Sequence, residues 1–315
     1  MNLRMPAAKL ACIALAAFAM QLASPAQSAL EKRNEAGLAQ AEQQLKNAQT
    51  DEARLAALNE KSLALAKLGR SAEALDVIRQ AEALAPDDLG AQVNKAIILD
   101  SNEEHQAARA LYDSLLGKFQ EWRGERAKSI RKGEKPAKSD GDAGMRAIST
   151  DAPMHSALNY ALLGNYNKAL AQLTRDFEIQ PRISMLSKDG DYATLWRLWL
   201  TAKSRSVDGL RPDTAITTLI QTANVSTPYH EEMLRLWWGK GHWQRILAAI
   251  NGMKISDEEK ETFLTEAHFF AAGYYRYMKR DTETALELLD AENARPFNGC
   301  IERLFIRKEI GELKK

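Results

Sequence analysis

Apolar residues recur along most of the chain at the three- and four-residue intervals typical of amphipathic helices. The clearest case is residues 58–86, LNEKSLALAKLGRSAEALDVIRQAEALAP, where two such helices flank Gly69. Small or apolar residues and then a proline follow this glycine at offsets of 5, 9, 12 and 17: Ala74, Ile78, Ala81 and Pro86. Small residues let two antiparallel helices approach closely, glycine supplies the turn, and proline ends the second helix. The segment therefore predicts a helical hairpin.

The same spacing recurs in residues 157–181, ALNYALLGNYNKALAQLTRDFEIQP. Measured from Gly164, three residues fall on the same offsets, Ala169, Leu173 and Pro181, whereas Asp176 replaces a small residue. These offsets are those of the tetratricopeptide (TPR) repeat. Two independent matches predict an all-α protein, a TPR-type α-solenoid of antiparallel helical hairpins.

Weaker copies of the pattern fill the rest of the chain. Residues 92–116 have Glu103 where glycine is preferred, residues 268–294 place Arg280 at the turn, and residues 191–223 have a longer turn with a proline. Residues 31–48 predict an N-terminal capping helix. Residues 295–315 predict a closing helix with a polar outer face and four apolar residues inward: Ile301, Leu304, Phe305 and Ile310.

The stretch LRLWWGKGHWQRI, residues 234–246, holds three of the six tryptophans. Laid on the same spacing, Gly241 is the turn glycine of a worn repeat, and Trp237 and Trp243 are packing residues. His242 is then a surface residue of the turn, and Trp238 points toward the groove. The stretch lacks the glycine spacing and the Lys-Ser/Thr pair of a phosphate-binding loop.

The first 28 residues have the pattern of a secretory signal peptide. Arg4 and Lys9 precede an apolar run over residues 10–20, which is too short to span a bilayer, and small residues follow. Cys12 lies inside the apolar run, so we expect no lipid anchor. The sequence therefore predicts export to the periplasm. Removal of the signal leaves Cys300 alone, which excludes an intramolecular disulfide and predicts a buried small residue, with an intermolecular bridge as the alternative.

We expect the remaining chain to divide into three parts. Residues 29–122 form an N-terminal helix and a pair of TPR hairpins, and residues 151–315 form further TPR-like repeats and the capping helix. Residues 123–150 are rich in Lys, Arg, Gly and Asp and predict a basic flexible linker. Its simple interpretation is a solvated insertion between hairpins. The alternative is a basic arm that contacts anionic lipid headgroups, cell-wall polymer or an acidic partner.

Composition and motifs argue against enzyme chemistry. Charged residues make up 27% of the chain, and the net charge of +1 is nearly balanced, so we expect no nucleic-acid partner. His230 is followed by two glutamates but lacks the second histidine of a helical zinc-protease motif, and no nucleophile-elbow motif is present. We therefore predict no catalytic residue, no metal and no cofactor. The five histidines are expected at surface or half-buried helix positions: His105, His155, His230, His242 and His268.

Binding is expected on the concave face, which the first helix of each hairpin lines. In the early repeats the groove-facing positions are Asn59, Leu63, Asn94, Ile97 and Leu158. In the later repeats they are Arg235, Trp238, Tyr274 and Tyr277, a composition typical of interface hot spots. Two alternatives stay open for these aromatic residues: packing in the core, and the contact surface of a homodimer.

The order of segments in the second half resembles the NlpI-like envelope proteins of Gram-negative bacteria. The resemblance covers residues 157–289 and rests on TLWRLWLTAK, EEMLRLWWGKGHWQRIL and TEAHFFAAGYYRYMKRDTETALELL. It implies a dimeric adaptor that brings cell-wall endopeptidases to a periplasmic processing protease. Two features depart from that family: the signal has no lipobox, and residues 123–144 form a basic insertion.

The sequence thus predicts a periplasmic adaptor or scaffold that binds other proteins, as a peptide or helix held in its groove. The partners expected from the resemblance are envelope proteases or cell-wall hydrolases. Two other functions remain as alternatives. One is a structural assembly factor for an envelope or secretion complex. The other is a cell-wall glycan-binding protein that uses its tryptophans and tyrosines.

Overall fold

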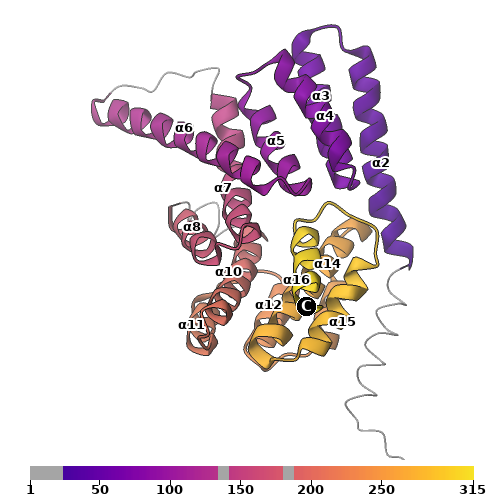
Figure 1. The fold of residues 1–315 in the computed structure, drawn as a ribbon, viewed down its shortest axis with the longest axis vertical. Coiled ribbons are helices and arrows are strands. Elements are labelled where there is room, and N and C mark those ends of the chain that lie inside the picture. Colours follow the sequence, from indigo (N-terminus) through magenta and orange to yellow (C-terminus); the bar gives the residue numbers. More distant parts are fainter. Residues whose placement is uncertain (1–23, 134–141, 180–187) are drawn as a thin grey trace, which may run out of the picture. The chain divides into compact units, whose positions relative to one another are not determined.

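The computed structural model describes residues 24–133, 142–179 and 188–315 (Figure 1). These residues form helices joined by short turns, with no strand among them. The chain divides into two compact units. The N-terminal unit comprises residues 34–176, and the C-terminal unit comprises residues 177–315 with the residues up to 33. In this described part, the predicted all-α architecture of antiparallel helical hairpins is confirmed.

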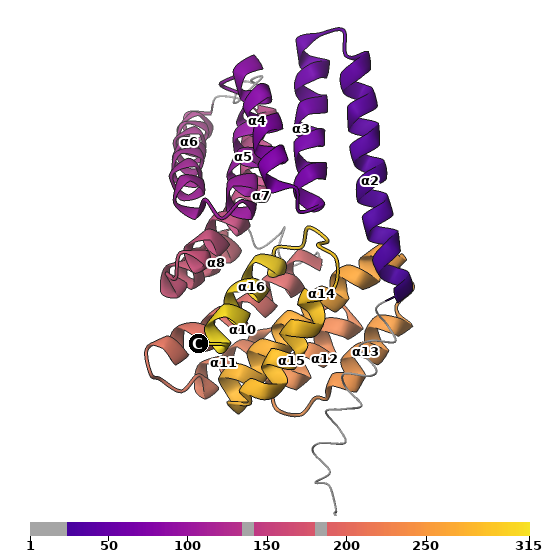
Figure 2. The same cartoon turned by 45° about the vertical axis from the view of Figure 1, so that its right-hand side comes forward.

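The N-terminal unit is built from consecutive helices that pack in chain order. Each helix from α3 to α6 contacts the one that follows it, and the first helices of successive hairpins also touch, α3 with α5 and α5 with α7. Helix α2 lies beside α3 in both views (Figures 1 and 2), where Lys61 pairs with Glu42 at 3.1 Å. The bounds are α2 Ser24–Asn47, α3 Asp51–Lys67, α4 Ser71–Leu84, α5 Leu89–Ser101, α6 His105–Arg131, α7 Asp142–Leu162 and α8 Tyr166–Ile179.

Local chemistry explains where these helices begin and end. The Thr50 hydroxyl accepts a hydrogen bond from the first turn of α3, and the Asp88 carboxylate does the same for α5. Gly69 and Gly164 have φ values of 73° and 81°, the left-handed conformation that glycine adopts without strain, so both predicted turn glycines are confirmed. Glu103 takes the same conformation at φ 65° in the turn between α5 and α6.

Buried polar contacts join three helices of the N-terminal unit. The Arg109 guanidinium on α6 donates to the backbone carbonyl and the hydroxyl of Ser156 on α7, both at 2.8 Å. The Asn159 amide, one turn later, donates to the Asp100 carboxylate of α5 at 2.7 Å. Because each of these groups is buried, leaving one without its partner would be costly. These contacts therefore fix how α5, α6 and α7 align.

The predicted flexible linker over residues 123–150 is wrong at both ends. Residues 123–131 continue α6, and residues 142–150 begin α7, whereas residues 134–141 lie outside the described residues. The last turns of α6 bury no side chain, but Glu125 pairs with Lys128 at 2.7 Å, and Arg126 lies 5.0 Å from the Trp122 ring centroid. Such local pairs favour a solvated helix.

The predicted division of the chain into domains at residues 123–150 is also wrong, because the boundary between the two units falls near residue 176.

The described part of the C-terminal unit contains three hairpins and a closing helix. The first helices again lie together, since α10 contacts α12 and α14, and α12 contacts α14. Helix α16 packs against α14 and α15 and closes the unit. The bounds are α10 Lys188–Val207, α11 Asp213–Thr222, α12 Pro228–Trp237, α13 Trp243–Gly252, α14 Asp257–Gly273, η1 Tyr274–Lys279, α15 Thr282–Asn293 and α16 Glu302–Leu313.

An aromatic cluster forms the centre of this unit. Trp196 and Trp199 of α10 lie 4.8 and 5.6 Å, between ring centroids, from Phe305 of α16. Phe269 of α14 lies 5.1 Å from Trp199, and all four side chains are fully or almost fully buried. Aromatic pairs at these separations contribute beyond the area that they bury. The cluster therefore joins the first and third hairpins to the closing helix.

The turn in LRLWWGKGHWQRI differs from the predicted one. Gly239, not Gly241, has the positive φ of 75° and follows the C-cap Trp238 as Gly69 follows Leu68. Gly241 has another role, because a Cβ there would lie 2.3 Å from the backbone nitrogen of Leu236. The turn is two residues longer than at Gly69, so Trp243 keeps its predicted packing position. Its side chain is buried, as is that of Trp237.

A π-helix, η1, follows directly on α14. Its i→i+5 hydrogen bonds turn the subsequent side chains relative to an α-helical continuation. Arg280, at φ 58°, ends it in the left-handed conformation, at the turn where the sequence placed it. The close approach before η1 depends on Gly273, because a Cβ there would lie 2.4 Å from Cδ1 of the buried Trp199.

We predict that Gly273→Ala lowers the free energy of unfolding of the C-terminal unit by about 1–3 kcal/mol, because the added methyl overpacks the Trp199 contact. Urea unfolding followed by tryptophan fluorescence measures this, since five of the six tryptophans lie in this unit. Gly311→Ala is the matched control. Gly311 lies in α16 with nothing within 4 Å of an added Cβ, so we expect about 0.5–1 kcal/mol of stabilisation. Equal effects of the two changes would contradict the packing argument.

Candidate partner-binding site

Arg235 of α12 and Trp238, the C-cap residue of that helix, lie at the surface, as a binding role requires. The Trp238 side chain is 45% exposed, and the Lys240 ammonium lies 3.6 Å from its ring centroid. Arg235 is exposed and pairs with Glu231 of the preceding turn at 2.6 Å. His242 is exposed in the turn, as predicted. A large aromatic side chain at the surface beside a cation is a feature of interface hot spots.

Tyr274 and Tyr277 do not face a groove. Both side chains are buried, at 4% and 8% exposure. Tyr274 packs edge-on against Trp237, at 6.0 Å between centroids, and Tyr277 packs against Trp199 at 6.3 Å. The prediction is therefore wrong for both residues, because the turn into η1 directs them into the aromatic core. The alternative interpretation, that these aromatic residues pack in the core, applies to both tyrosines.

The groove positions predicted in the early repeats differ in their burial. Asn59 and Asn94 lie on the adjacent first helices α3 and α5, where the side-chain amide of Asn94 donates a hydrogen bond to Oδ1 of Asn59 at 3.3 Å. Both are half-buried, as are Leu63 and Ile97. Leu158 is fully buried, so its groove-facing assignment is wrong.

Two histidines are buried, in contrast to the surface or half-buried positions predicted for them. His230 on α12 is 1% exposed, and its Nδ1 lies 2.5 Å from the Thr227 hydroxyl. Burial lowers the pKa of His230 to about 4, despite Asp191 nearby, so the ring is neutral at neutral pH. His268 on α14 is 6% exposed, and its Nδ1 lies 2.8 Å from the Leu264 carbonyl.

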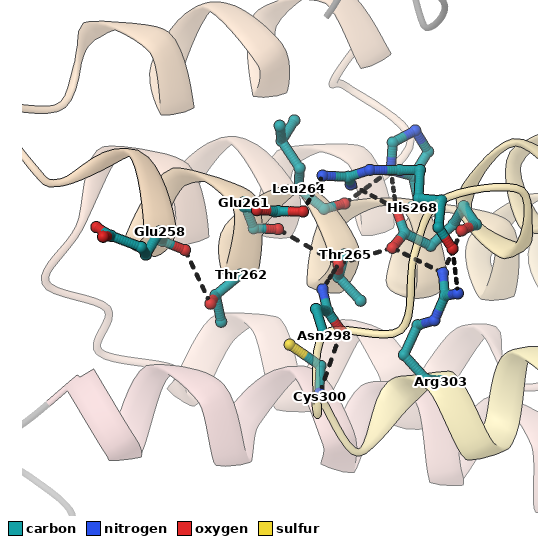
Figure 3. A network of polar contacts seen from close by, with 11 residues as sticks. Glu258, Glu261, Thr262, Leu264, Thr265, His268, Asn298, Cys300 and Arg303 are labelled. Carbon is teal, nitrogen blue, oxygen red and sulfur yellow. Dashed lines mark hydrogen bonds and ion pairs between the residues drawn. The ribbon is translucent and has the colours of Figure 1, made fainter. Parts of the chain in front are cut away.

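The closing helix is held by a buried ion network around Glu292 of α15 (Figure 3). The Glu292 carboxylate pairs with Arg295 at 2.7 Å and with Arg303 at 3.1 Å, and it accepts a hydrogen bond from the Thr265 hydroxyl at 2.7 Å. His268 Nδ1 lies 3.2 Å from the same carboxylate. Although burial alone would raise the pKa of Glu292, the hydrogen bond and charge of His268 and the two arginines lower it to about 2.

The same network orders the segment between α15 and α16. The Arg303 guanidinium also donates to the backbone carbonyls of Glu292 and Arg295. The Asn298 amide donates to the Thr265 hydroxyl at 2.7 Å, and its carbonyl oxygen accepts from the Cys300 amide at 3.2 Å (Figure 3). Residues 294–301 are thereby attached to α14. The predicted polar outer face of the closing helix is thus incomplete, because its charged residues Glu302, Arg303 and Glu309 are buried.

A small cavity of about 270 Å³ lies beside this network. Glu266 of α14 and Glu302 of α16 line it, together with Cys300 and His230. Burial and mutual repulsion raise the pKa of Glu266 well above its ordinary value, and burial raises that of Glu302 to about 7. The Tyr192 hydroxyl donates to the Glu302 carboxyl at 2.6 Å. Cys300 is half-buried, and burial raises the pKa of its thiol, so it remains a protonated, weakly reactive thiol.

A second set of ion pairs connects α10, η1 and α16. The Lys203 ammonium, 3% exposed, pairs with Glu309 at 2.9 Å and also with Glu312. The Arg276 guanidinium of η1 pairs with the same two carboxylates, at 2.5 Å and 3.1 Å. The Tyr277 hydroxyl donates to Glu309. Two cations and two carboxylates therefore balance each other.

A surface pocket of about 740 Å³ opens above these ion pairs, within the C-terminal unit. Helix α10, the α10–α11 turn, η1 and the end of α16 line it, including Lys203, Arg276 and Glu312 at its floor. Three exposed cations lie around its rim: Arg211, Lys279 and Arg280. Val207 and Leu210 also line the pocket and are 64% and 55% exposed, although both are large apolar side chains. Of the binding residues predicted from the sequence, Tyr277 alone is among those that line this pocket, and its side chain is buried.

No protein-family model matches the chain, and no curated protein matches it in sequence. Within the described ranges, no helix has the length and apolar character needed to cross a membrane. The same ranges contain no group of three or more His, Cys, Asp or Glu side chains arranged to hold a metal ion.

We predict that Glu292→Gln lowers the free energy of unfolding of the C-terminal unit by about 3 kcal/mol, because Arg303 stays buried without its counter-charge and Arg295 keeps only Glu261, at 3.2 Å. Urea unfolding at pH 7 measures this change. Glu287→Gln, at an exposed position of the same helix, is the control and should stay within about 0.5 kcal/mol of the wild type. Because the pKa of Glu292 is lowered, its contribution is present above pH 4.5 and lost as pH falls toward 2.

We further predict that raising the pH from 6.5 to 8 destabilises the C-terminal unit by about 1 kcal/mol. The pKa of Glu302 is raised to about 7, so the native state holds a proton that the unfolded chain has already released. His230 acts in the opposite direction, most strongly below pH 6.5 and weakly up to about pH 7.5, because its pKa is lowered and the unfolded chain still binds protons there. Glu266, whose pKa is also raised, adds to the loss. Unfolding midpoints at the two pH values test this. Glu302→Gln keeps the acceptor for Tyr192 and should reduce the loss, and an unchanged loss would contradict the assignment.

Proposed function

We propose that the protein is a periplasmic TPR-type adaptor that binds other envelope proteins by stoichiometric contact. The observation that carries this proposal is the packing of first helices against one another in successive hairpins, α3, α5 and α7 in one unit and α10, α12 and α14 in the other. In helical-repeat proteins this arrangement creates extended binding surfaces, on which many small contacts hold a peptide or a partner helix.

Surface chemistry in the C-terminal unit supports the same proposal. Four large apolar side chains in the described ranges are exposed: Ile130, Val207, Leu210 and Trp238. Three of them lie in the C-terminal unit, each beside cationic side chains. Exposed apolar groups with a polar rim are typical of protein interaction sites. The resemblance to NlpI-like proteins suggests cell-wall hydrolases or a processing protease as the partners.

The proposal is tested by capture from a periplasmic extract with the chain lacking its first 28 residues. Recovered proteases or hydrolases support the adaptor. Secretion-machine subunits favour the assembly factor instead. Retention on purified peptidoglycan without any protein partner favours the glycan-binding alternative and contradicts the adaptor.

We predict that Trp238→Ala weakens binding of a captured partner about thirtyfold, the effect of truncating a hot-spot residue worth about 2 kcal/mol. Because Trp238 is exposed, the fold should persist, which circular dichroism checks. Ile130→Ala, which also truncates an exposed apolar side chain but in the other unit, is the matched control. Titration calorimetry measures both affinities. Equal affinities for Trp238→Ala and the wild type would remove Trp238 from the binding surface.

A further inference from the structure

The pocket between the α10–α11 turn and η1 has an uneven distribution of charge. At its floor, Lys203 and Arg276 are paired with Glu309 and Glu312, so these four groups sum to zero. The rim carries the excess, because three cations face one carboxylate, Asp213. The neutral floor fixes the shape of the pocket, and the rim sets its preference for a negative ligand.

The rim cations are free to bind a ligand. Among the residues that the structure describes, no carboxylate pairs with Arg211, Lys279 or Arg280. The Lys279 ammonium lies over the Tyr274 ring, at 5.7 Å from its centroid. Arginine can bind a carboxylate through two parallel hydrogen bonds, and lysine adds a mobile point charge.

The rim also offers an apolar contact. Val207 ends α10 and Leu210 follows Gly209 in the turn, so both side chains stand at the edge of the pocket. They are two of the four large apolar side chains that are exposed in the described part of the chain. Because they lie beside unpaired cations, the pocket suits a ligand that carries apolar and anionic groups close together along its chain.

We propose that this pocket binds an acidic peptide segment of a partner protein, with its carboxylates on Arg211, Lys279 and Arg280 and an apolar side chain on Val207 and Leu210. The volume of about 740 Å³ lies within the range of pockets that enclose a drug-sized ligand, which corresponds to a few residues of peptide. The inference rests on the proposed adaptor function and names the class of segment that this site recognises.

The lining favours a peptide over other anions. Single-stranded nucleic acid is held by aromatic side chains on which bases stack, but Tyr277, the aromatic residue in the lining, is buried. A membrane surface requires a wide apolar face, whereas this pocket presents two aliphatic side chains. Carboxylates and aliphatic groups that alternate along a peptide match both parts of the rim.

The probe is a fluorescein-labelled octapeptide of alternating Glu and Leu, measured by fluorescence anisotropy against the chain without its first 28 residues. We expect saturable binding that weakens as salt rises, because the rim charges are exposed. The same peptide with Gln for Glu, and a version with Ser for Leu, should each bind about tenfold more weakly. A Gln peptide that binds as well as the Glu peptide would overturn the proposal.

Two double variants locate the binding site. Arg211→Gln with Lys279→Gln, and Val207→Ser with Leu210→Ser, should each weaken the probe about tenfold. Arg245→Gln with Lys254→Gln removes two exposed charges elsewhere in the same unit and is the matched control. If either pocket variant loses its helical circular dichroism, Arg280→Asn serves in its place, because asparagine tolerates the left-handed backbone there. Unchanged affinity in the pocket variants overturns the proposal.

Two competitors test the other anions. If an oligothymidylate displaces the probe at lower concentration than unlabelled peptide does, the pocket is assigned to nucleic acid instead. If vesicles of phosphatidylglycerol do so, it is assigned to lipid.

The probe and the periplasmic capture together separate this inference from the adaptor function. If periplasmic capture succeeds but the probe does not bind, the pocket inference fails alone. If the probe binds through the pocket but no protein is captured, the adaptor proposal fails.

Discussion

Burial of the Glu292 carboxylate is the constraint on which the C-terminal unit depends. A charge away from water is tolerated only when counter-charges and hydrogen bonds surround it, and here Arg295, Arg303 and Thr265 supply them. Arg303 is in turn placed by its hydrogen bonds to the backbone carbonyls of Glu292 and Arg295. The start of α16 is thereby fixed, which brings Phe305 into the aromatic cluster.

The position of α16 in turn determines what the surface presents. Its Glu309 and Glu312 reach Lys203 and Arg276, so the last helix neutralises the floor of the pocket between α10 and η1. The rim keeps an excess of positive charge, because three exposed cations stand there beside Val207 and Leu210, with Asp213 as the carboxylate among the described residues of the rim. The carboxylates of α16 thus pair with Lys203 and Arg276 and stabilise the interior. Because they are used in these pairs, the rim keeps its positive charge, which suits an acidic peptide.

Spacing along the chain predicts the hairpins well, because small residues and turn glycines act locally. Gly69 and Gly164 show this, and even the worn repeat keeps Trp243 in register although its turn is two residues longer. Tyr274 and Tyr277 could not be placed in the same way, since a π-helix changes which side chains face inward and has no simple sequence signal. The Glu292 network was missed because Glu and Arg at helical spacing usually mark a solvated face.

The second half of α6 has a consequence for how the chain responds to proteases. From Arg123 to Lys132 four basic residues are exposed, Arg126 is half-buried, and no side chain is fully buried. The cleavage sites of trypsin-like enzymes therefore lie on turns with low local stability. Tyr112 and Leu115, earlier in the helix, are fully buried in the core of the N-terminal unit. A cut in the exposed turns therefore leaves two fragments that stay associated, and only a denaturing gel separates them.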